Sequence, residues 1–267
     1  MRIEKLTGNV GAEITGCDLS NPTADMTDQI LDALFEHGVI VIRNQTLSPE
    51  DHIALAEQIG EIDVNRFFNP VPDYPKIAEV RTSPDQSKVI GGTWHSDHSY
   101  DEKPAMASIL VARELPPYGG DTLFASQVAA AANLSDGLRE TLKGLNAIHS
   151  DGSFSQSILG DLDSDAFNGA VSHPMIIRHP QTDQEALFVN GDFTTHIDGW
   201  TVEESAPLLS YLYQYCTQPA FTCRVKWASG SVAIWDNRLV QHFATADYHG
   251  HARLMHRITI KGQSLQR

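Results

Sequence analysis

A histidine followed two residues later by an aspartate is the pattern in this sequence best suited to bind a metal. It occurs three times, as His95-Ser96-Asp97, His149-Ser150-Asp151 and His196-Ile197-Asp198. Such a pair and one remote histidine hold Fe(II) on one face and leave positions open for oxygen and a co-substrate. Because so short a pattern also arises by chance, at most one of the three is expected to be a ligand pair.

The surroundings favour the first pair. On a strand, His95 and Asp97 would point to the same face, because side chains alternate along a strand. The other two pairs run into glycine-containing sequences that are typical of turns. Spacing therefore favours His95 and Asp97, but it leaves open another pair or no metal site at all.

A third ligand has to come from elsewhere, and spacing does not select one among the 12 histidines. The C-terminal region offers His242, His249, His251 and His256. In the expected strand 252–260, alternation places Arg253, Arg257 and Thr259 on one face. Two arginines on a buried face require something anionic beside them, whereas on an edge strand the same face would lie in solvent.

Composition and charge exclude several classes of function. The 267 residues include 34 acidic residues against 19 Lys plus Arg, which gives a formal net charge of -15. Such a surface repels phosphate backbones and anionic lipid, so no nucleic-acid or membrane partner is expected. The first residues lack an apolar signal core and no run approaches the length of a membrane span, so we expect a cytoplasmic protein.

Caps and apolar patterns predict the elements that must position these residues. Helices are expected at 27–37, from 49 to Gly60, from Ser126 to about 145 with a break near 135–137, and after Thr201. Strands are expected at 39–42, 106–111, 175–178, 186–189, 224–227, 231–235 and 252–260, with 224–235 as a hairpin. We predict one domain over 1–267, mainly β with flanking helices, for which a jelly roll is one solution.

Five motifs follow one another along nearly the whole chain. They are Trp94-His95-Ser96-Asp97, Gly119-Gly120-Asp121-Thr122-Leu123, Trp235-Asp236-Asn237-Arg238 with Gln241-His242, Asp247-Tyr248, and Arg253-x-x-x-Arg257. In this order they resemble the taurine dioxygenase family of Fe(II)- and 2-oxoglutarate-dependent dioxygenases. The resemblance implies a double-stranded β-helix, and an oxidoreductase that uses Fe(II), 2-oxoglutarate and O2 to hydroxylate a substrate.

The resemblance also implies individual roles. His95, Asp97 and His242 match the iron ligands of the family. Thr122 and Arg253 match the residues that bind the distal carboxylate of 2-oxoglutarate, which suits a threonine hydroxyl and an arginine fork. Arg257 matches the arginine near the acidic group of the primary substrate, and Phe193 matches an aromatic residue of its pocket.

Further residues are expected near the substrate pocket. His98 and Tyr100 follow the ligand pair and either line the substrate pocket or serve the structure. Phe154 lies within one position of another pocket aromatic of the family. Where taurine enzymes carry a histidine this chain places Asn65, and where they carry an asparagine it has Gly91.

These two departures argue against taurine and leave the substrate open. Because Arg257 remains, we predict a small anionic substrate with a carboxylate, sulfonate or sulfate group, as in relatives that act on phenoxyalkanoates and alkyl sulfates. Hydroxylation beside a heteroatom would cleave a C–S or C–O bond. A homo-oligomer, dimer or tetramer, is expected. The alternatives are a cupin-like metalloenzyme that does not use 2-oxoglutarate and a non-catalytic protein that binds small anions.

Overall fold

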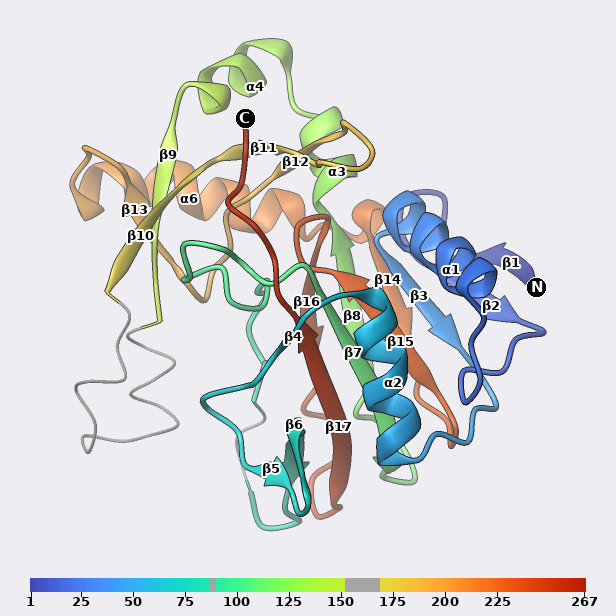
Figure 1. The fold of residues 1–267 in the computed structure, drawn as a ribbon. Helices are drawn as coiled ribbons and strands as arrows, with labels where there is room; N and C mark the ends of the chain where they lie inside the picture. Colours follow the sequence, from blue (N-terminus) through green and yellow to red (C-terminus); the bar gives the residue numbers. More distant parts are fainter. Residues whose placement is uncertain (87–89, 152–168) are drawn as a thin grey trace.

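Two facing β-sheets form the centre of the molecule, with helices against the outer side of the larger sheet (Figure 1). The computed structural model describes residues 1–86, 90–151 and 169–267. In this part, the larger sheet runs in the order β1 (Arg2–Lys5), β2 (Ala12–Thr15), β3 (Val39–Ile42), β15 (Val232–Asp236), β7 (Ala107–Glu114), β17 (Arg253–Ile260), β6 (Tyr74–Thr82) and β5 (Pro70–Val71), with β4 (Ile62–Asp63) beside β17. The smaller sheet runs in the order β14 (Thr222–Val225), β8 (Thr122–Ser126) and β16 (Val240–Ala244).

The alternation of side chains explains why the central strands are apolar on both faces. In β3, Val39 and Val41 point into the space between the two sheets, where they pack with Phe124 of β8. Ile40 and Ile42 point the other way, into the core beneath the helices. Buried on both faces, such a strand loses the usual alternation of apolar and polar residues.

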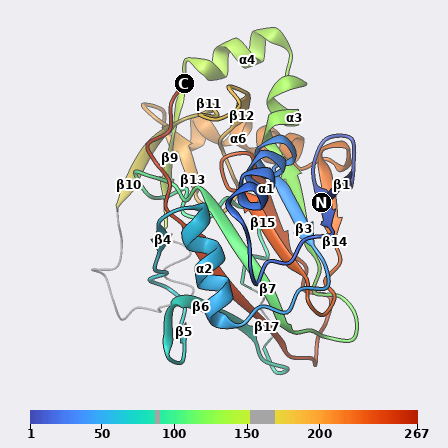
Figure 2. The same cartoon turned by 45° about the vertical axis from the view of Figure 1, so that its right-hand side comes forward.

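Helices α1 (Ala24–His37) and α2 (Pro49–Ile59) cover the outer face of the larger sheet, as Figure 2 shows from a second side. Helix α2 begins at the predicted Ser48-Pro49 and has a complete capping box between Ser48 and Asp51. Helix α1 begins earlier than predicted, because the Thr23 side chain accepts the N–H of Met26 and caps it there.

A second layer of helices and short strands closes one end of the sheets. Its core packs α3 (Gln127–Ala132), α4 (Asp136–Lys143) and α6 (Val202–Cys216) against neighbouring strands. These strands are β9 (Asn146–Ser150), β10 (Ala170–Pro174), β11 (Ile176–Arg178), β12 (Glu185–Leu187) and β13 (Thr194–Ile197), and a short 3-10 turn, η3 (Pro219–Phe221), leads into β14. The expected break after Ser126 is present, between α3 and α4, and the C-terminal tail pairs with β11 through Gln266 and Arg178.

The prediction of a mainly β protein with flanking helices is confirmed, but one predicted connection is wrong. Strands β14 and β15 do not form a hairpin: β14 pairs with β8 in the smaller sheet, and β15 pairs with β3 and β7 in the larger one. The short segment between them crosses from one sheet to the other, and the carbonyl of Gly230 accepts the N–H of Gln45. In the described ranges, no helix combines the length and apolar character needed to cross a bilayer.

A buried histidine of α2 is expected to make stability depend on pH. Burial, with a smaller contribution from Arg113 and His256, lowers the pKa of His52 to about 3. The unfolded chain takes up a proton there as the pH falls below about 6.5, and the folded chain does not until about 3, so stability is complete above that window and declines within it. The free energy of unfolding, measured in urea, should fall between pH 7.5 and pH 5.0 in wild type. In His52→Leu this fall should be smaller by about 2 kcal/mol.

The matched control is His249→Leu, a substitution on the exposed surface. If both variants reduced the pH dependence of the free energy of unfolding equally, burial of His52 would not be the cause of that dependence.

Candidate active site

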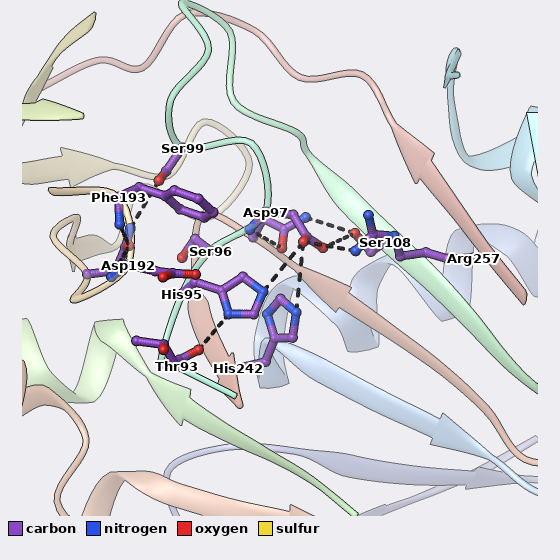
Figure 3. A network of polar contacts seen from close by, with 12 residues as sticks. Thr93, His95, Ser96, Asp97, Ser99, Ser108, Asp192, Phe193, His242 and Arg257 are labelled. Carbon is purple, nitrogen blue, oxygen red and sulfur yellow. Dashed lines mark hydrogen bonds and ion pairs between the residues drawn. The ribbon is translucent and has the colours of Figure 1, made fainter. Parts of the chain in front are cut away.

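Two histidines and one aspartate meet at the open edge of the smaller sheet (Figure 3). His242 lies in β16, and the chain at His95 pairs with it by two backbone hydrogen bonds of 3.1 and 2.8 Å. This pairing sets the two imidazoles side by side. Oδ1 of Asp97 then lies 3.8 Å from Nε2 of His95 and 3.9 Å from Nε2 of His242.

The predicted reason for this convergence is wrong, although the residues do converge. His95 forms a single bridge rather than part of a strand, and the chain turns from Asp97 to Tyr100. At His98 the backbone is left-handed, with φ at +57°. The turn, not strand alternation, brings Asp97 back to the histidines, and it also brings His98 into the same cavity. Such backbone strain is a common feature of functional sites.

The protonation of the three groups suits a divalent metal. Nδ1 of His95 lies 2.7 Å from the carbonyl of Thr93, which can only accept, so Nε2 is left with a free lone pair. Burial and the neighbouring His95 lower the pKa of His242 to about 3, so this imidazole is neutral. Burial alone would raise the pKa of Asp97, but Arg257 and the histidines outweigh it and hold the pKa below its ordinary value. Two imidazoles and a carboxylate are the donor set that fits Fe(II) with open positions.

A buried arginine without an ion-pair partner lies in the same cavity. Arg253 is 4% exposed, and among the described residues no carboxylate lies within ion-pair distance of it. Burial lowers its pKa, but a guanidinium stays charged in proteins. The hydroxyl of Thr122 accepts the indole N–H of Trp227 at 3.0 Å, which leaves its own proton to donate. Arg253 and Thr122 can therefore both donate hydrogen bonds to one carboxylate.

The glycine motif before Thr122 makes room for this arginine. Gly120 has a φ of +67°, and a Cβ there would lie 3.2 Å from Cδ of Arg253. Its N–H donates to Oδ1 of Asp247 at 2.8 Å, which fixes the turn. The Gly119-Gly120-Asp121-Thr122 and Asp247-Tyr248 motifs thus meet beside Arg253.

Aromatic side chains form another wall of the cavity, beside the second arginine. Nη1 of Arg257 lies 3.1 Å from Oδ1 of Asp97, and its guanidinium carbon lies 4.8 Å from the ring centre of Phe68. Phe193 and Tyr100 pack edge to face, with ring centres 4.7 Å apart. The space between its walls, with the opening to solvent included, is about 680 Å³. The site residues predicted from the sequence all line this cavity: Asn65, His95, Asp97, His98, Tyr100, Thr122, Phe193, His242, Arg253 and Arg257.

Asn65 and His98, two of the predicted pocket residues, use part of their polar atoms for contacts within the protein. The Asn65 oxygen accepts the N–H groups of Phe67 and Phe68, while its Nδ2 is buried without a partner at the cavity wall. Nδ1 of His98 lies 3.0 Å from Asp63 and 3.4 Å from the Asp101 carboxylate. Asn65 therefore fixes the chain that leads into Phe67 and Phe68, and His98 fixes the turn after Asp97, while both residues also line the cavity.

Sequence reasoning missed Phe67 and Phe68 as lining residues, although two consecutive aromatics directly after Asn65 were a usable signal. Phe154 lies outside the described residues. Gly91 lines the cavity with a φ of +80°, and a Cβ there would lie 3.2 Å from Cε1 of His95. Substitution at Gly91 would therefore press on a proposed metal ligand.

Among the described residues, no third ligand lies beside either of the other two His-x-Asp pairs. His149 is buried, with Nδ1 3.2 Å from Ser99, and burial together with His173 lowers its pKa to about 3. Asp198 is exposed and accepts the hydroxyl of Ser172. Among the residues described, the potential metal-binding group found is that of His95, Asp97 and His242.

The facing sheets, the histidine and aspartate group and the buried arginine together define a metal-dependent oxygenase of the double-stranded β-helix class. Residues 2–259 match the model of the Taurine catabolism dioxygenase TauD, TfdA family. The chain belongs to this family and is a dioxygenase that depends on Fe(II) and 2-oxoglutarate, which is also called alpha-ketoglutarate.

Similar proteins show the range of this family. An alpha-ketoglutarate-dependent sulfate ester dioxygenase of Pseudomonas putida is 33% identical over 273 residues, covering 98% of this chain and 89% of that protein. An alpha-ketoglutarate-dependent 2,4-dichlorophenoxyacetate dioxygenase of a Burkholderia species is 34% identical over 227 residues, covering 78% and 76%. The crystal structure of AAD-2 in complex with Mn(II) and N-oxalylglycine superposes with a TM-score of 0.86 at 25% identity and covers 100% of both chains.

Proposed function

We propose that this enzyme hydroxylates a small organic anion, with two buried arginines that bind two different acidic groups. The observation that carries the proposal is the position of Arg253 and Arg257 in one cavity, beside the group of His95, Asp97 and His242. A buried guanidinium requires an anionic partner. Arg257 has Asp97 within reach, whereas Arg253 has no such carboxylate among the described residues. Arg253 is therefore suited to a carboxylate brought by a ligand.

The proposed roles follow from these contacts. His95, Asp97 and His242 would hold Fe(II), which with 2-oxoglutarate and O2 supplies the power to oxidise a C–H bond as succinate and carbon dioxide form. Arg253 and Thr122 would bind the distal carboxylate of 2-oxoglutarate, which orients the co-substrate for chelation. The protein's own contribution is positioning: the cavity keeps both ligands at fixed places around one metal.

The other arginine and the aromatic wall would bind the primary substrate. Arg257 would bind its carboxylate, sulfonate or sulfate group, and Phe67, Phe68, Tyr100 and Phe193 would pack against an aryl or alkyl body. Phe193, Tyr100, His98 and Asn65 would form the sides of this pocket. Hydroxylation next to an ether or ester oxygen, or next to sulfur, would give an unstable product and cleave the bond.

A screen of oxygen uptake with Fe(II) and 2-oxoglutarate tests the substrate class. Aryloxyalkanoates and alkyl sulfates should stimulate uptake, because they pair an anion for Arg257 with a body for the aromatic wall. Taurine should show a kcat/KM at least about 10-fold lower, because its ammonium group would be desolvated against aromatic rings.

A matched pair of compounds isolates the charge. Phenoxyacetate and its neutral amide have nearly the same shape, so only the anion should couple oxygen uptake to succinate formation. Turnover limited to neutral or cationic compounds would contradict the role of Arg257.

Both alternatives lose support from the geometry. A cupin-like enzyme without 2-oxoglutarate would not need Arg253 and Thr122, and a non-catalytic anion-binding protein would not need the three ligands. We further propose that 1–267 acts as one domain, since β1, β2 and β3 extend the same sheet as β17. A homo-oligomer, dimer or tetramer, and a cytoplasmic location stay predictions; light scattering during gel filtration measures the former.

A further inference from the structure

We infer that Ser108 and Asn237 are positioning residues that fix the Asp97 carboxylate in its metal-binding orientation. The inference rests on the proposed metal site and gives a role to the Trp235-Asp236-Asn237-Arg238 motif, which the ligand set leaves unexplained. Figure 3 shows Asp97 with the two histidines on one side and Ser108 on the other.

The two oxygens of the Asp97 carboxylate face different partners. Oδ1 lies 3.8 and 3.9 Å from the Nε2 atoms of the histidines. Oδ2 accepts the hydroxyl of Ser108, on β7, at 2.7 Å. Both residues are buried, with exposures of 5% for Asp97 and 0% for Ser108. With Oδ2 held by the rigid strand, Oδ1 is the oxygen directed at the metal.

Asn237 determines the direction of the serine proton. Its Oδ1 accepts two N–H groups, from the Trp235 indole at 2.8 Å and from the Asp97 backbone at 3.3 Å. This assigns the amide orientation, because an amide nitrogen could accept neither. Nδ2 therefore faces Ser108 and donates to its hydroxyl oxygen at 3.2 Å. The serine proton is left for Asp97.

Buried charges on either side hold Asn237 in place. The Asp236 carboxylate accepts the N–H and the Nε–H of Arg238, both at 2.9 Å. It also lies 3.1 Å from Nε2 of His179, and all three side chains are buried. Burial raises the pKa of Asp236, but Arg238 and His179 outweigh it and lower the pKa to about 2. The turn between β15 and β16 is thus a fixed support for the serine.

Loss of the serine hydroxyl would free the carboxylate to turn. Nη1 of Arg257 already lies 3.1 Å from Oδ1 of Asp97. Without a donor on Oδ2, a carboxylate can rotate to pair both oxygens with one guanidinium, which is the preferred geometry of such pairs. Oδ1 would then be directed at Arg257 and away from the metal.

Titration with Mn(II) tests this inference without relying on activity. The full-length protein is prepared free of metal as wild type, Ser108→Ala and Thr259→Val, and free Mn(II) is followed by electron paramagnetic resonance. We expect Ser108→Ala to weaken Mn(II) binding about 10- to 100-fold, as other losses of a ligand's hydrogen-bond partner do. In the oxidation assay the same variant should raise the KM for Fe(II) more than the KM for 2-oxoglutarate.

Thr259→Val is the matched control. Thr259 lies opposite Ser108 in the register of β7 and β17, is buried, and its hydroxyl has no hydrogen-bond partner in the described structure. Its Mn(II) affinity should equal that of wild type. Equal losses in both variants, or none in Ser108→Ala, would overturn the inference.

A second variant covers the case in which Ser108→Ala fails to fold. Ser108→Cys keeps a weak donor at the same place, so its Mn(II) affinity should lie between those of wild type and the alanine variant. An affinity equal to that of wild type for the cysteine variant would count against the inference. Failure of the proposed metal site is distinct, because wild type itself would then neither bind Mn(II) nor form succinate. Failure of the proposed substrate class is distinct as well, because wild type would still bind Mn(II) while only neutral or cationic compounds couple turnover.

Discussion

Asp97→Ala is expected to reduce succinate formation from 2-oxoglutarate to background. The substitution removes the single carboxylate of the proposed ligand set and leaves Arg257 buried without its ion-pair partner. An uncompensated guanidinium beside the two histidines would repel a cation, so metal binding should fall with activity. Succinate is measured by chromatography and Mn(II) binding by electron paramagnetic resonance.

The control for Asp97→Ala is the aspartate of another His-x-Asp sequence. Asp198→Ala removes the exposed aspartate of His196-Ile197-Asp198 and should leave both measurements unchanged. Full turnover in Asp97→Ala would contradict the metal site proposed for His95, Asp97 and His242.

Arg253→Ala is expected to weaken the use of 2-oxoglutarate strongly. Loss of one partner of a buried charge pair costs about 2–5 kcal/mol, so the KM for 2-oxoglutarate should rise by roughly 30-fold to several-thousand-fold. Arg253→Lys should recover part of this loss, because a lysine keeps the charge but lacks the fork. The measurement is the KM for 2-oxoglutarate at saturating Fe(II).

Pyruvate as co-substrate distinguishes the loss of carboxylate binding from a general loss of active-site structure. It retains the 2-oxo acid that would chelate the metal but lacks the distal carboxylate, so Arg253→Ala should change its poor turnover little. The exposed Arg178→Ala variant serves as the control for removal of an arginine. An equal loss with both co-substrates would contradict the carboxylate subsite of Arg253 and Thr122.

The class of reaction could be predicted from the five motifs and the family that they resemble, and β17 from alternation. Arg253 and Arg257 share one face of that strand and reach the cavity, while Ile258 and Ile260 on the other face pack beneath the helices. Both faces are buried, which excludes the exposed edge strand that was the alternative. Local sequence was sufficient here because the period of a strand is fixed by the backbone.

Features that depend on distant contacts could not be predicted in this way. The convergence of Asp97 with His95 depends on a turn and on a bridge to His242, far away in the sequence. The separation of β14 from β15 depends on how the two sheets close, which no local pattern records. Ser108 gave no signal at all, because a serine in an apolar strand acquires a role only when Asp97 and Asn237 are brought to it.

The position of Gly91 links the choice of substrate to the proposed iron site. Asparagine, which the resemblance places at this position in taurine enzymes, tolerates a left-handed backbone better than most side chains. The obstacle is the ring of His95, which a Cβ at Gly91 would approach to 3.2 Å. We therefore expect a mutational path from this enzyme toward taurine specificity to pass through variants in which His95, a proposed metal ligand, has to shift. Compensating changes around His95 would have to come first, which makes the order of substitutions decisive for such an evolutionary transition.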